Sequence, residues 1–325
     1  MIKKIDAFVK KNMIFLILLT LVIGFFSGQY FHKSTINLLK SLILPVAFSM
    51  LWASMIELKI KKFVESFKFP KQLILGNTLS LIIAPLIMFP IALIFAKSAK
   101  MFAGLVLSSL VPPGGFITYW TMILGANMGL AVSITLTTFV ISLVLIPFGM
   151  KLLVGGKVAV NTVVLFNKII VLVIGPFLLA MLTRYVIVKN KGEKGILDSK
   201  PYFHLFSSIM AFLIVFIGIS VKANFILSHF SIVMIPAIGS LLYYIVAYPI
   251  SYFISRKVFG LSLNDTIPIV FGTATKNLSI AMGLAAAAFG PLTLLAVVTC
   301  MIFQMPFASI WHKVFLNMKK KEIQT

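Results

Sequence analysis

Long apolar runs without a single charge recur along this chain of 325 residues. Residues 13–26 read MIFLILLTLVIGFF, and residues 241–254 read LLYYIVAYPISYFI. About 20 such residues in a helix cross the hydrocarbon layer of a membrane. Only 11% of the residues are charged, whereas soluble domains have about 25%. The sequence therefore predicts an all-α protein that crosses the lipid bilayer several times.

Ten windows of apolar residues are long enough to be membrane-spanning helices. They lie at residues 12–31, 37–56, 72–96, 101–123, 127–150, 168–188, 203–221, 229–254, 266–289 and 291–315. The first window follows the basic stretch MIKKIDAFVKKN and has no small-residue cleavage site before Tyr30. We therefore interpret it as an uncleaved first span rather than as a signal peptide.

The basic residues are distributed between the apolar runs. With the N-terminus in the cytoplasm, the map places 20 of the 29 lysines and arginines on the cytoplasmic side and 8 on the other, with Lys276 inside a span. An excess of lysine and arginine in cytoplasmic loops sets the orientation of membrane proteins. We expect a multi-pass protein of the plasma membrane with both termini in the cytoplasm. Because this pattern explains the net charge of +22, no nucleic-acid partner is expected.

Short matches indicate two copies of one five-helix unit, residues 1–155 and 156–325. The matched pairs are LVIGFF at 21–26 with LVIGPF at 172–177, FPI at 89–91 with YPI at 248–250, and IPF at 146–148 with MPF at 305–307. The stretch GGKVAVN at 155–161 is the expected connector. Because five is odd, the second copy enters the membrane inverted, which is typical of alternating-access secondary transporters.

Interruptions occur at corresponding places in the two copies. The fourth span contains VPPGGFITYWT at 111–121, whose prolines and glycines leave main-chain groups unpaired in mid-span. The ninth span contains FGTATKNLSIAMG at 271–283. Broken helices in corresponding positions are the best sequence indication of a transport site. The candidate substrate- or ion-binding residues in these segments are Gly114, Gly115, Thr118, Tyr119, Thr273, Thr275, Lys276 and Asn277.

Lys276 lies too deep in its span to reach the interface easily. A lysine at the centre of a membrane helix costs about 2.5–3.5 kcal/mol, so it normally faces a cavity or a partner. On a continuous helix it shares a small, polar face with Thr273, Asn277, Ile280 and Gly283. All seven acidic residues map to loops, tails or helix ends. We therefore expect the ammonium either to lose its proton or to bind an anion.

The segments PPGGFITYWTMILGANMGLAVSITLTT and GTATKNLSIAMGLAAAAFGPLTLLAVV resemble the fourth to fifth and ninth to tenth spans of the bile acid:sodium symporter family. This family belongs to a superfamily that also contains arsenite exporters. The resemblance implies a core domain and a panel domain, with the fourth and ninth spans unwound and crossing near mid-membrane beside two sodium sites. It also implies small organic anions as substrates.

The resemblance assigns positions in this chain to the family's sodium ligands. The glutamate of the ninth span falls on Gly272 and the glutamine there on Lys276. The asparagine that follows is kept as Asn277, and the glutamine of the third span falls on Ser80. The carboxylate that supplies a negative field for sodium is therefore absent from this chain.

The remaining ligand positions are also mostly changed. The asparagine of the fourth span falls on Thr118 or Tyr119, and the serine of the fifth span falls on Ala131. The threonine of the fifth span is kept as Thr135. We hypothesise that the ammonium of Lys276 replaces the missing cation, so that coupling uses H+ or the protein is a uniporter. Sodium-coupled symport of organic anions is the alternative.

Other functional classes have less support. An efflux carrier for arsenite or another toxic solute would need a thiolate in the fourth span, where Val111 and Pro112 stand, and the one cysteine, Cys300, lies in the tenth span. The four histidines are scattered, so no metal site or cofactor is expected. An intramembrane enzyme would need paired carboxylates or a serine–lysine pair, for which Lys276 with Ser279 is a weak candidate. We predict neither enzymatic activity nor a protein partner.

Overall fold

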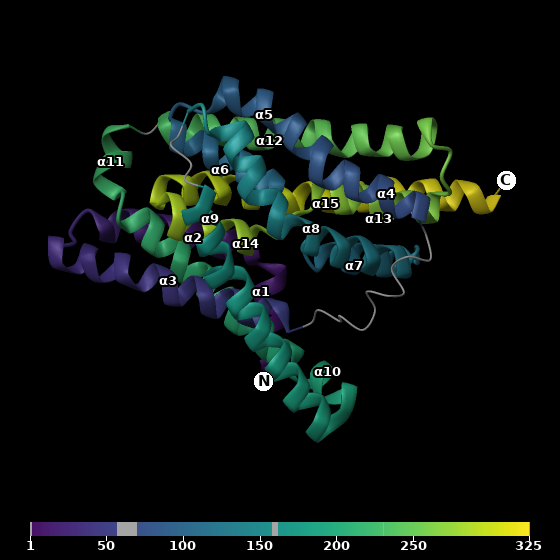
Figure 1. Cartoon of the computed structure of the whole chain (residues 1–325), viewed down its shortest axis with the longest axis horizontal. Helices are drawn as coiled ribbons and strands as arrows, with labels where there is room; N and C mark the ends of the chain where they lie inside the picture. Colours follow the sequence, from purple (N-terminus) through teal and green to yellow (C-terminus); the bar gives the residue numbers. More distant parts are fainter. Residues whose placement is uncertain (1, 57–69, 158–161, 230, 325) are drawn as a thin grey trace. The chain divides into compact units, whose positions relative to one another are not determined.

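The computed structural model describes residues 2–56, 70–157, 162–229 and 231–324, and most of them are helical (Figure 1). Among these residues the β-type pairing is an isolated antiparallel bridge between Pro113 and Lys276. The predicted all-α class is confirmed for this part of the chain. The chain divides into two compact units: residues 1–58, 160–233 and 279–298 form unit 1, and residues 59–159, 234–278 and 299–325 form unit 2.

Unit 1 is built around the long helix α10 (Gly175–Ser220), against which α1, α2 and α3 pack. α10 bends at Gly192, whose φ of 65° is a conformation that glycine adopts without strain. The other elements of the unit are α1 (Ile2–Lys11), α2 (Met13–Gly28), α3 (Lys33–Met55), α9 (Thr162–Ile169), the π-helical turn η4 (Ile170–Ile174), α11 (Ala223–Ser228), most of α14 (Leu278–Leu284), the π-helical turn η6 (Ala285–Phe289) and the first residues of α15 (Pro291–Gln324).

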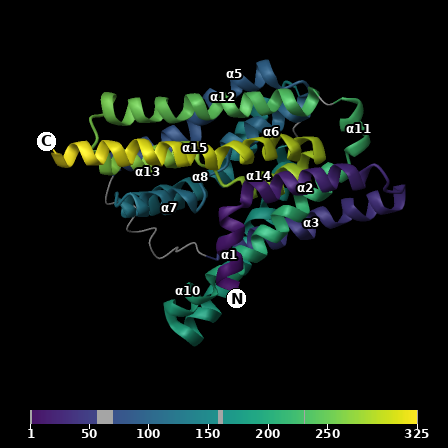
Figure 2. The same ribbon diagram turned by 180° about the vertical axis from the view of Figure 1, so that it is seen from behind.

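Unit 2 is organised around α13 (Leu263–Ala274), which packs against α4, α7 and α8. Figures 1 and 2 show α13 and α15 side by side, and the rings of Phe271 and Phe315 lie 5.8 Å apart between them. The remaining elements are α4 (Pro70–Thr78), the π-helical turn η3 (Leu79–Ile83), α5 (Ala84–Phe95), α6 (Ala99–Leu110), α7 (Phe116–Ile123), α8 (Met128–Val154), most of α12 (Ser231–Phe253) and the π-helical turn η5 (Ile254–Val258).

Among the described residues, six helices are long and apolar enough to cross a membrane, which confirms the multi-pass prediction. They are Lys33–Met55, Pro70–Phe95, Met128–Val154, Phe166–Ser220, Met234–Val258 and Pro291–Glu322. Shorter apolar helices occupy Phe15–Gly28, Ala99–Leu110 and Leu278–Phe289. The helix Phe166–Ser220 alone covers two of the predicted spans, 168–188 and 203–221. The total of ten spans stays a prediction.

Two glycines of α2 allow its close approach to α10. Gly24 and Gly28 are spaced one helical turn apart, and a Cβ atom at Gly28 would lie 2.5 Å from the main-chain oxygen of Ser220. A Cβ atom at Gly24 would meet the side chain of Ile219. The Ser220 hydroxyl donates to the Gly24 carbonyl at 2.9 Å. Small residues at this spacing bring membrane helices into backbone contact, so this pair fixes the packing inside unit 1.

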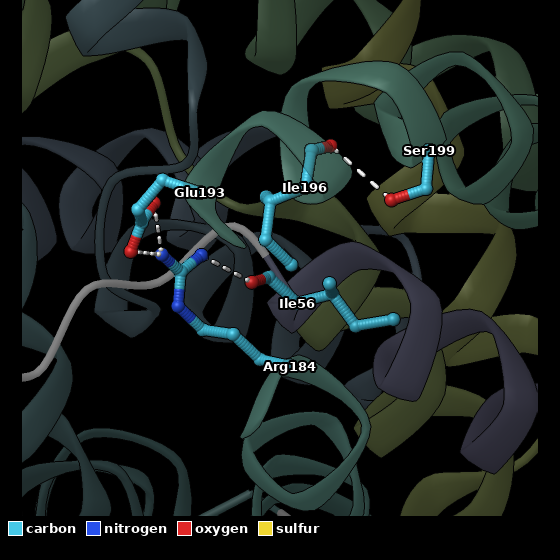
Figure 3. Close-up of polar contacts among 5 residues, drawn as sticks. All are labelled: Ile56, Arg184, Glu193, Ile196 and Ser199. Atoms are coloured by element: carbon cyan, nitrogen blue, oxygen red, sulfur yellow. Dashed lines mark hydrogen bonds and ion pairs between the residues drawn. The ribbon is translucent and has the colours of Figure 1, made fainter. Parts of the chain in front are cut away.

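Arg184 of α10 closes the bend of that helix and holds the end of α3 (Figure 3). Its Nη2 donates to both carboxylate oxygens of Glu193 at 2.8 Å, and its Nη1 donates to the carbonyl of Ile56 at 3.2 Å. Ile56 directly follows α3, and a cation is favourable at the carbonyls of a helix end. In the second arm, the Ser199 hydroxyl donates to the Ile196 carbonyl at 3.2 Å.

The two compact units are a different division of the chain from the two predicted repeats, which they do not test. Each unit takes residues from both sides of the expected boundary at 155/156. The duplication stays a prediction, and residues 158–161 of the expected connector lie outside the described residues.

Candidate functional site

Two helix interruptions meet inside unit 2. α6 ends at Leu110 and α7 begins at Phe116, while α13 ends at Ala274 and α14 begins at Leu278. The two interrupted segments pair through the antiparallel bridge of Pro113 with Lys276. The two segments that the sequence predicted to be broken therefore lie in direct contact.

Glycine and proline allow this contact. A Cβ atom at Gly114 would lie 3.3 Å from the Cα atom of Asn277, so a larger side chain would press on the opposite segment. The main-chain N–H of Asn277 donates to the Pro112 carbonyl at 2.8 Å. The prolines at 112 and 113 have no N–H of their own to satisfy in this buried stretch.

Three successive N–H groups leave the helical pattern in the second interruption. Those of Lys276, Asn277 and Leu278 donate to the Gln304 side-chain oxygen, the Pro112 carbonyl and the Lys276 carbonyl at 2.8, 2.8 and 3.0 Å. Buried main-chain donors require such partners. The interruption is therefore a fully bonded local structure and not a frayed end.

The predicted continuous polar face is wrong. It placed Thr273, Lys276, Asn277, Ile280 and Gly283 on one side of a single helix, which needs regular 3.6-residue turns throughout. The chain is instead extended at Thr275, and a new helix begins at Leu278. Thr273 thus belongs to a different helix from Ile280 and Gly283.

Two hydroxyl groups donate to carbonyls that the interruption leaves without a helical donor. Gly272 and Thr273 lose their helical donors because the N–H groups of residues 276 and 277 point elsewhere. The Ser80 hydroxyl donates to the Gly272 carbonyl at 2.9 Å, and the Tyr243 hydroxyl donates to the Thr273 carbonyl at 3.4 Å. Side chains from η3 and α12 therefore hold the broken end of α13.

The ammonium of Lys276 is buried in the same place. The residue is 1% exposed, and Nζ donates to the carbonyl and the hydroxyl of Ser80 at 2.5 and 2.8 Å. Both partners are neutral, and no described carboxylate forms an ion pair with Lys276. The ammonium also lies just past the C-terminal end of α13, where the helix dipole favours a cation.

The carbonyl of Ser80 is available for a cation because of a local irregularity in its own helix. In the π-helical turn η3, the N–H of Ala84 donates to Leu79, so it does not reach Ser80. The next residue, Pro85, has no N–H to give. The Ser80 carbonyl is thus left without a helical donor, and the ammonium of Lys276 takes that place.

The acidic residue nearest to Lys276 in sequence is already engaged. Asp265 accepts a hydrogen bond from Asn127 Nδ2 at 2.8 Å and another from Gln72 Nε2 at 3.2 Å. It lies in the first turn of α13, where a carboxylate is favourable. Asp265 therefore joins α13 to α4 and α8, at the opposite end of α13 from the interruption.

The environment of Gly272 is apolar and filled. A Cβ atom there would lie 2.9 Å from Cδ1 of Ile117 and 3.2 Å from Cγ2 of Ile134. A carboxylate side chain at this position would need both isoleucines to move. The space that the family resemblance assigns to a glutamate is thus closed by two apolar side chains.

The structure brings together four of the ten predicted site residues: Ser80, Gly114, Lys276 and Asn277. Gly115, which directly precedes α7, is exposed, and Tyr119 of α7 is 48% exposed. Four threonine hydroxyls donate instead to carbonyls three or four residues earlier in the chain. These bonds are Thr118 to Gly115, Thr135 to Ala131, Thr273 to Ile269 and Thr275 to Phe271, at 2.8, 2.9, 2.8 and 2.6 Å.

Three residues that shape the site escaped the sequence analysis: Pro85, Tyr243 and Gln304. Gln304 is 3% exposed and lies in the apolar run MIFQMPF at 301–307, so a polar residue inside a span was a usable signal. Tyr243 and Pro85 carried no such signal, because tyrosine and proline are common in membrane helices. Their roles depend on which carbonyls the folded chain leaves unpaired.

Comparison with known proteins gives the family. Residues 44–229, more than half of the chain, match the model of the Sodium Bile acid symporter family. The chain belongs to this family. The resemblance predicted from the sequence is therefore confirmed.

The relatives that the chain matches are distant in sequence. The chain is 24% identical to the probable sodium/metabolite cotransporter BASS3, chloroplastic, of Arabidopsis thaliana. The 255 aligned residues are 77% of this chain and 56% of the relative. For the protein of the same name in Oryza sativa subsp. japonica, the identity is 25% over 202 residues, covering 62% and 46%. The uncharacterized protein YbaS of Bacillus subtilis is 32% identical over 90 residues, covering 28% and 29%. The chain spans about half the length of the plant relatives it matches.

Proposed function

We propose that this chain is a secondary active transporter of small organic anions in which the ammonium of Lys276 serves as a built-in cation. The observation that carries the proposal is the buried contact of Lys276 Nζ with Ser80 where the two interrupted segments pair. In this view the ammonium takes the place of a bound sodium ion. The coupling ion is then H+, or the protein is a uniporter.

The electrostatics of the site favour an anionic substrate. A buried charge whose partners are all neutral is unfavourable, and a counter-ion brought to the site compensates it. Because Lys276 is 1% exposed, its part in this conformation is that of a bound ion and not of a direct substrate ligand. The proposed substrate contacts are Gly115, which directly precedes α7, and Thr118 and Tyr119 in α7; Gly115 and Tyr119 are exposed and Thr118 is partly exposed.

The architecture that goes with this function is ten spans arranged as two inverted five-helix repeats. Two observations support it. Both interruptions lie at corresponding places of the proposed copies, and each compact unit draws on both halves of the chain. We propose that unit 2 corresponds to the core domain and unit 1 to the panel domain.

Sodium-coupled symport is the second candidate. It is favoured by the name of the plant relatives, probable sodium/metabolite cotransporter. Against it stand the filled space at Gly272 and the ammonium on Ser80. The two candidates differ in one measurable property, the dependence of uptake on a sodium gradient.

Uptake into proteoliposomes tests the proposal. A panel of carboxylates, from acetate to a bile acid, is measured with sodium or choline outside and at two pH values. We expect uptake of at least one anion without sodium. In Lys276→Met we expect the uptake rate to fall by about tenfold or more. Removing one partner of a buried polar pair costs about 1–3 kcal/mol, and about 1.4 kcal/mol corresponds to a factor of ten. The matched control is Lys97→Met, which removes an exposed loop lysine.

Two results decide against the built-in cation. One is uptake that requires sodium in the wild-type protein. The other is a Lys276→Met protein that retains full uptake with an unchanged pH profile.

A further inference from the structure

The side-chain amide of Gln304 forms hydrogen bonds with both the main-chain N–H and the main-chain carbonyl of Lys276. Its Oε1 accepts from the Lys276 N–H at 2.8 Å, and its Nε2 donates to the Lys276 carbonyl at 3.1 Å. Gln304 comes from α15 and is 3% exposed. The amide therefore satisfies both polar main-chain groups of one residue, as a neighbouring strand would.

We infer that Gln304 is a positioning residue that fixes the extended conformation of the interruption, and through it the place of the Lys276 ammonium. The effect that we expect on anion uptake rests on the proposed function. The effect on the conformation at Lys276 does not. The inference assigns to the tenth predicted span a role in a site whose other parts come from the third, fourth, eighth and ninth.

The geometry explains why one residue has this influence. Residue 276 is the pairing point with Pro113, and its neighbour Asn277 donates to Pro112. Without the amide, the buried Lys276 N–H would lose its acceptor, while the Lys276 carbonyl would keep the Leu278 N–H at 3.0 Å. The helical register from α13, in which the N–H of residue 276 donates to the Gly272 carbonyl, would then become the better arrangement. A continuous helix would carry the ammonium away from Ser80. The side chain of Gln304 thus works against the helical alternative.

Substitutions can separate hydrogen bonding from volume. Gln304→Met keeps an unbranched chain of similar size but removes both hydrogen bonds. Gln304→Glu keeps an acceptor for the Lys276 N–H, but an ionised carboxylate cannot donate to the Lys276 carbonyl. When protonated, the same carboxyl regains a donor. The control is Gln29→Leu, which removes a glutamine whose Nε2 donates to the Phe25 carbonyl one turn back in α2.

The structural readout does not depend on transport or on the ammonium. In a Cys300→Ala background, the chain carries Lys276→Cys, and the rate of its reaction with a small methanethiosulfonate reagent reports the exposure of position 276. We expect slow reaction with Gln304 present and reaction faster by about tenfold with Gln304→Met, the factor expected for loss of buried hydrogen bonds. For Gln304→Glu, we expect the ratio of its labelling rate to that of the Gln304 parent to fall toward one as the pH is lowered, because the protonated carboxyl regains a donor for the Lys276 carbonyl.

Transport supplies the second readout. With Lys276 in place, Gln304→Met should lower the maximal rate of anion uptake more than it changes KM, because the site is misplaced and not emptied. Unchanged labelling in Gln304→Met, with a folded and monodisperse protein, overturns the inference whatever transport does. If that variant does not fold, an effect of Gln304→Glu that is independent of pH overturns it. Altered labelling with normal uptake keeps Gln304 as a structural clamp and contradicts the proposed function instead.

Discussion

Lys276 owes its position to main-chain groups that neighbouring helices leave unpaired. The Ser80 carbonyl is free because Ala84 donates to Leu79 and Pro85 cannot donate. Sequence alone predicted that a lysine in this span needs a partner. It could not predict that the partner is a carbonyl, because the π-helical turn that frees it has no recognisable residue pattern.

A double-mutant cycle tests the contact of Lys276 with Ser80. Ser80→Ala removes the hydroxyl contact with Nζ and the donor to the Gly272 carbonyl, so we expect it to lower stability by about 1–3 kcal/mol. In a Lys276→Met background the same change should cost less, with a coupling of about 0.5–3 kcal/mol. The measurement is thermal or denaturant unfolding of the purified protein in detergent.

Ser142→Ala is the control for this cycle. Ser142 is also buried in unit 2, but its hydroxyl donates at 2.7 Å to the Phe139 carbonyl of its own helix. Its cost should be the same with and without Lys276. Equal costs of Ser80→Ala in the two backgrounds would mean that the ammonium and the hydroxyl do not interact.

At the scale of helices, apolar length and breaks were predictable, but pairing was not. The apolar windows located the helices, and proline and glycine located the interruption at 111–115. The interruption at 275–277 was marked only by its polarity, and the assumption of a continuous polar face there failed. The close approach of α2 to α10 through Gly24 and Gly28 was not predicted, because a glycine in a span has several explanations.

Gly28→Leu tests that approach. A leucine side chain would meet the main chain of Ser220, which cannot rotate away, so either the helices separate or the backbone shifts. We expect a loss of about 1–3 kcal/mol in the free energy of unfolding, and a smaller loss for Gly28→Ala. Gly156→Leu is the control, since nothing lies within 4 Å of a Cβ atom at Gly156. Equal stability of the Gly28→Leu and Gly156→Leu proteins would show that α2 does not contact α10 there.

At the scale of the whole molecule, the number of crossings depends on α10. The helix Phe166–Ser220 has 55 residues, more than twice what one crossing needs, and it bends at Gly192. The lysine distribution predicts that its two arms cross separately, with the bend in the cytoplasm. If they cross as one, the two termini of the chain must lie on opposite sides of the membrane.

Single cysteines decide between these topologies. In the Cys300→Ala background, Lys97→Cys, Lys194→Cys and Lys320→Cys place exposed thiols in the predicted loop between spans three and four, at the bend of α10 and near the C-terminus. A membrane-impermeant maleimide added to intact cells should label only position 97, and permeabilisation should expose 194 and 320, because ten spans place both on the cytoplasmic side with the N-terminus. Labelling of both 97 and 194 in intact cells would place these two positions on the same side, which three intervening crossings do not allow, and would remove the inverted relation of the two halves. The proposed alternation between inward- and outward-open states would then lose its structural basis, since it requires two copies of opposite orientation.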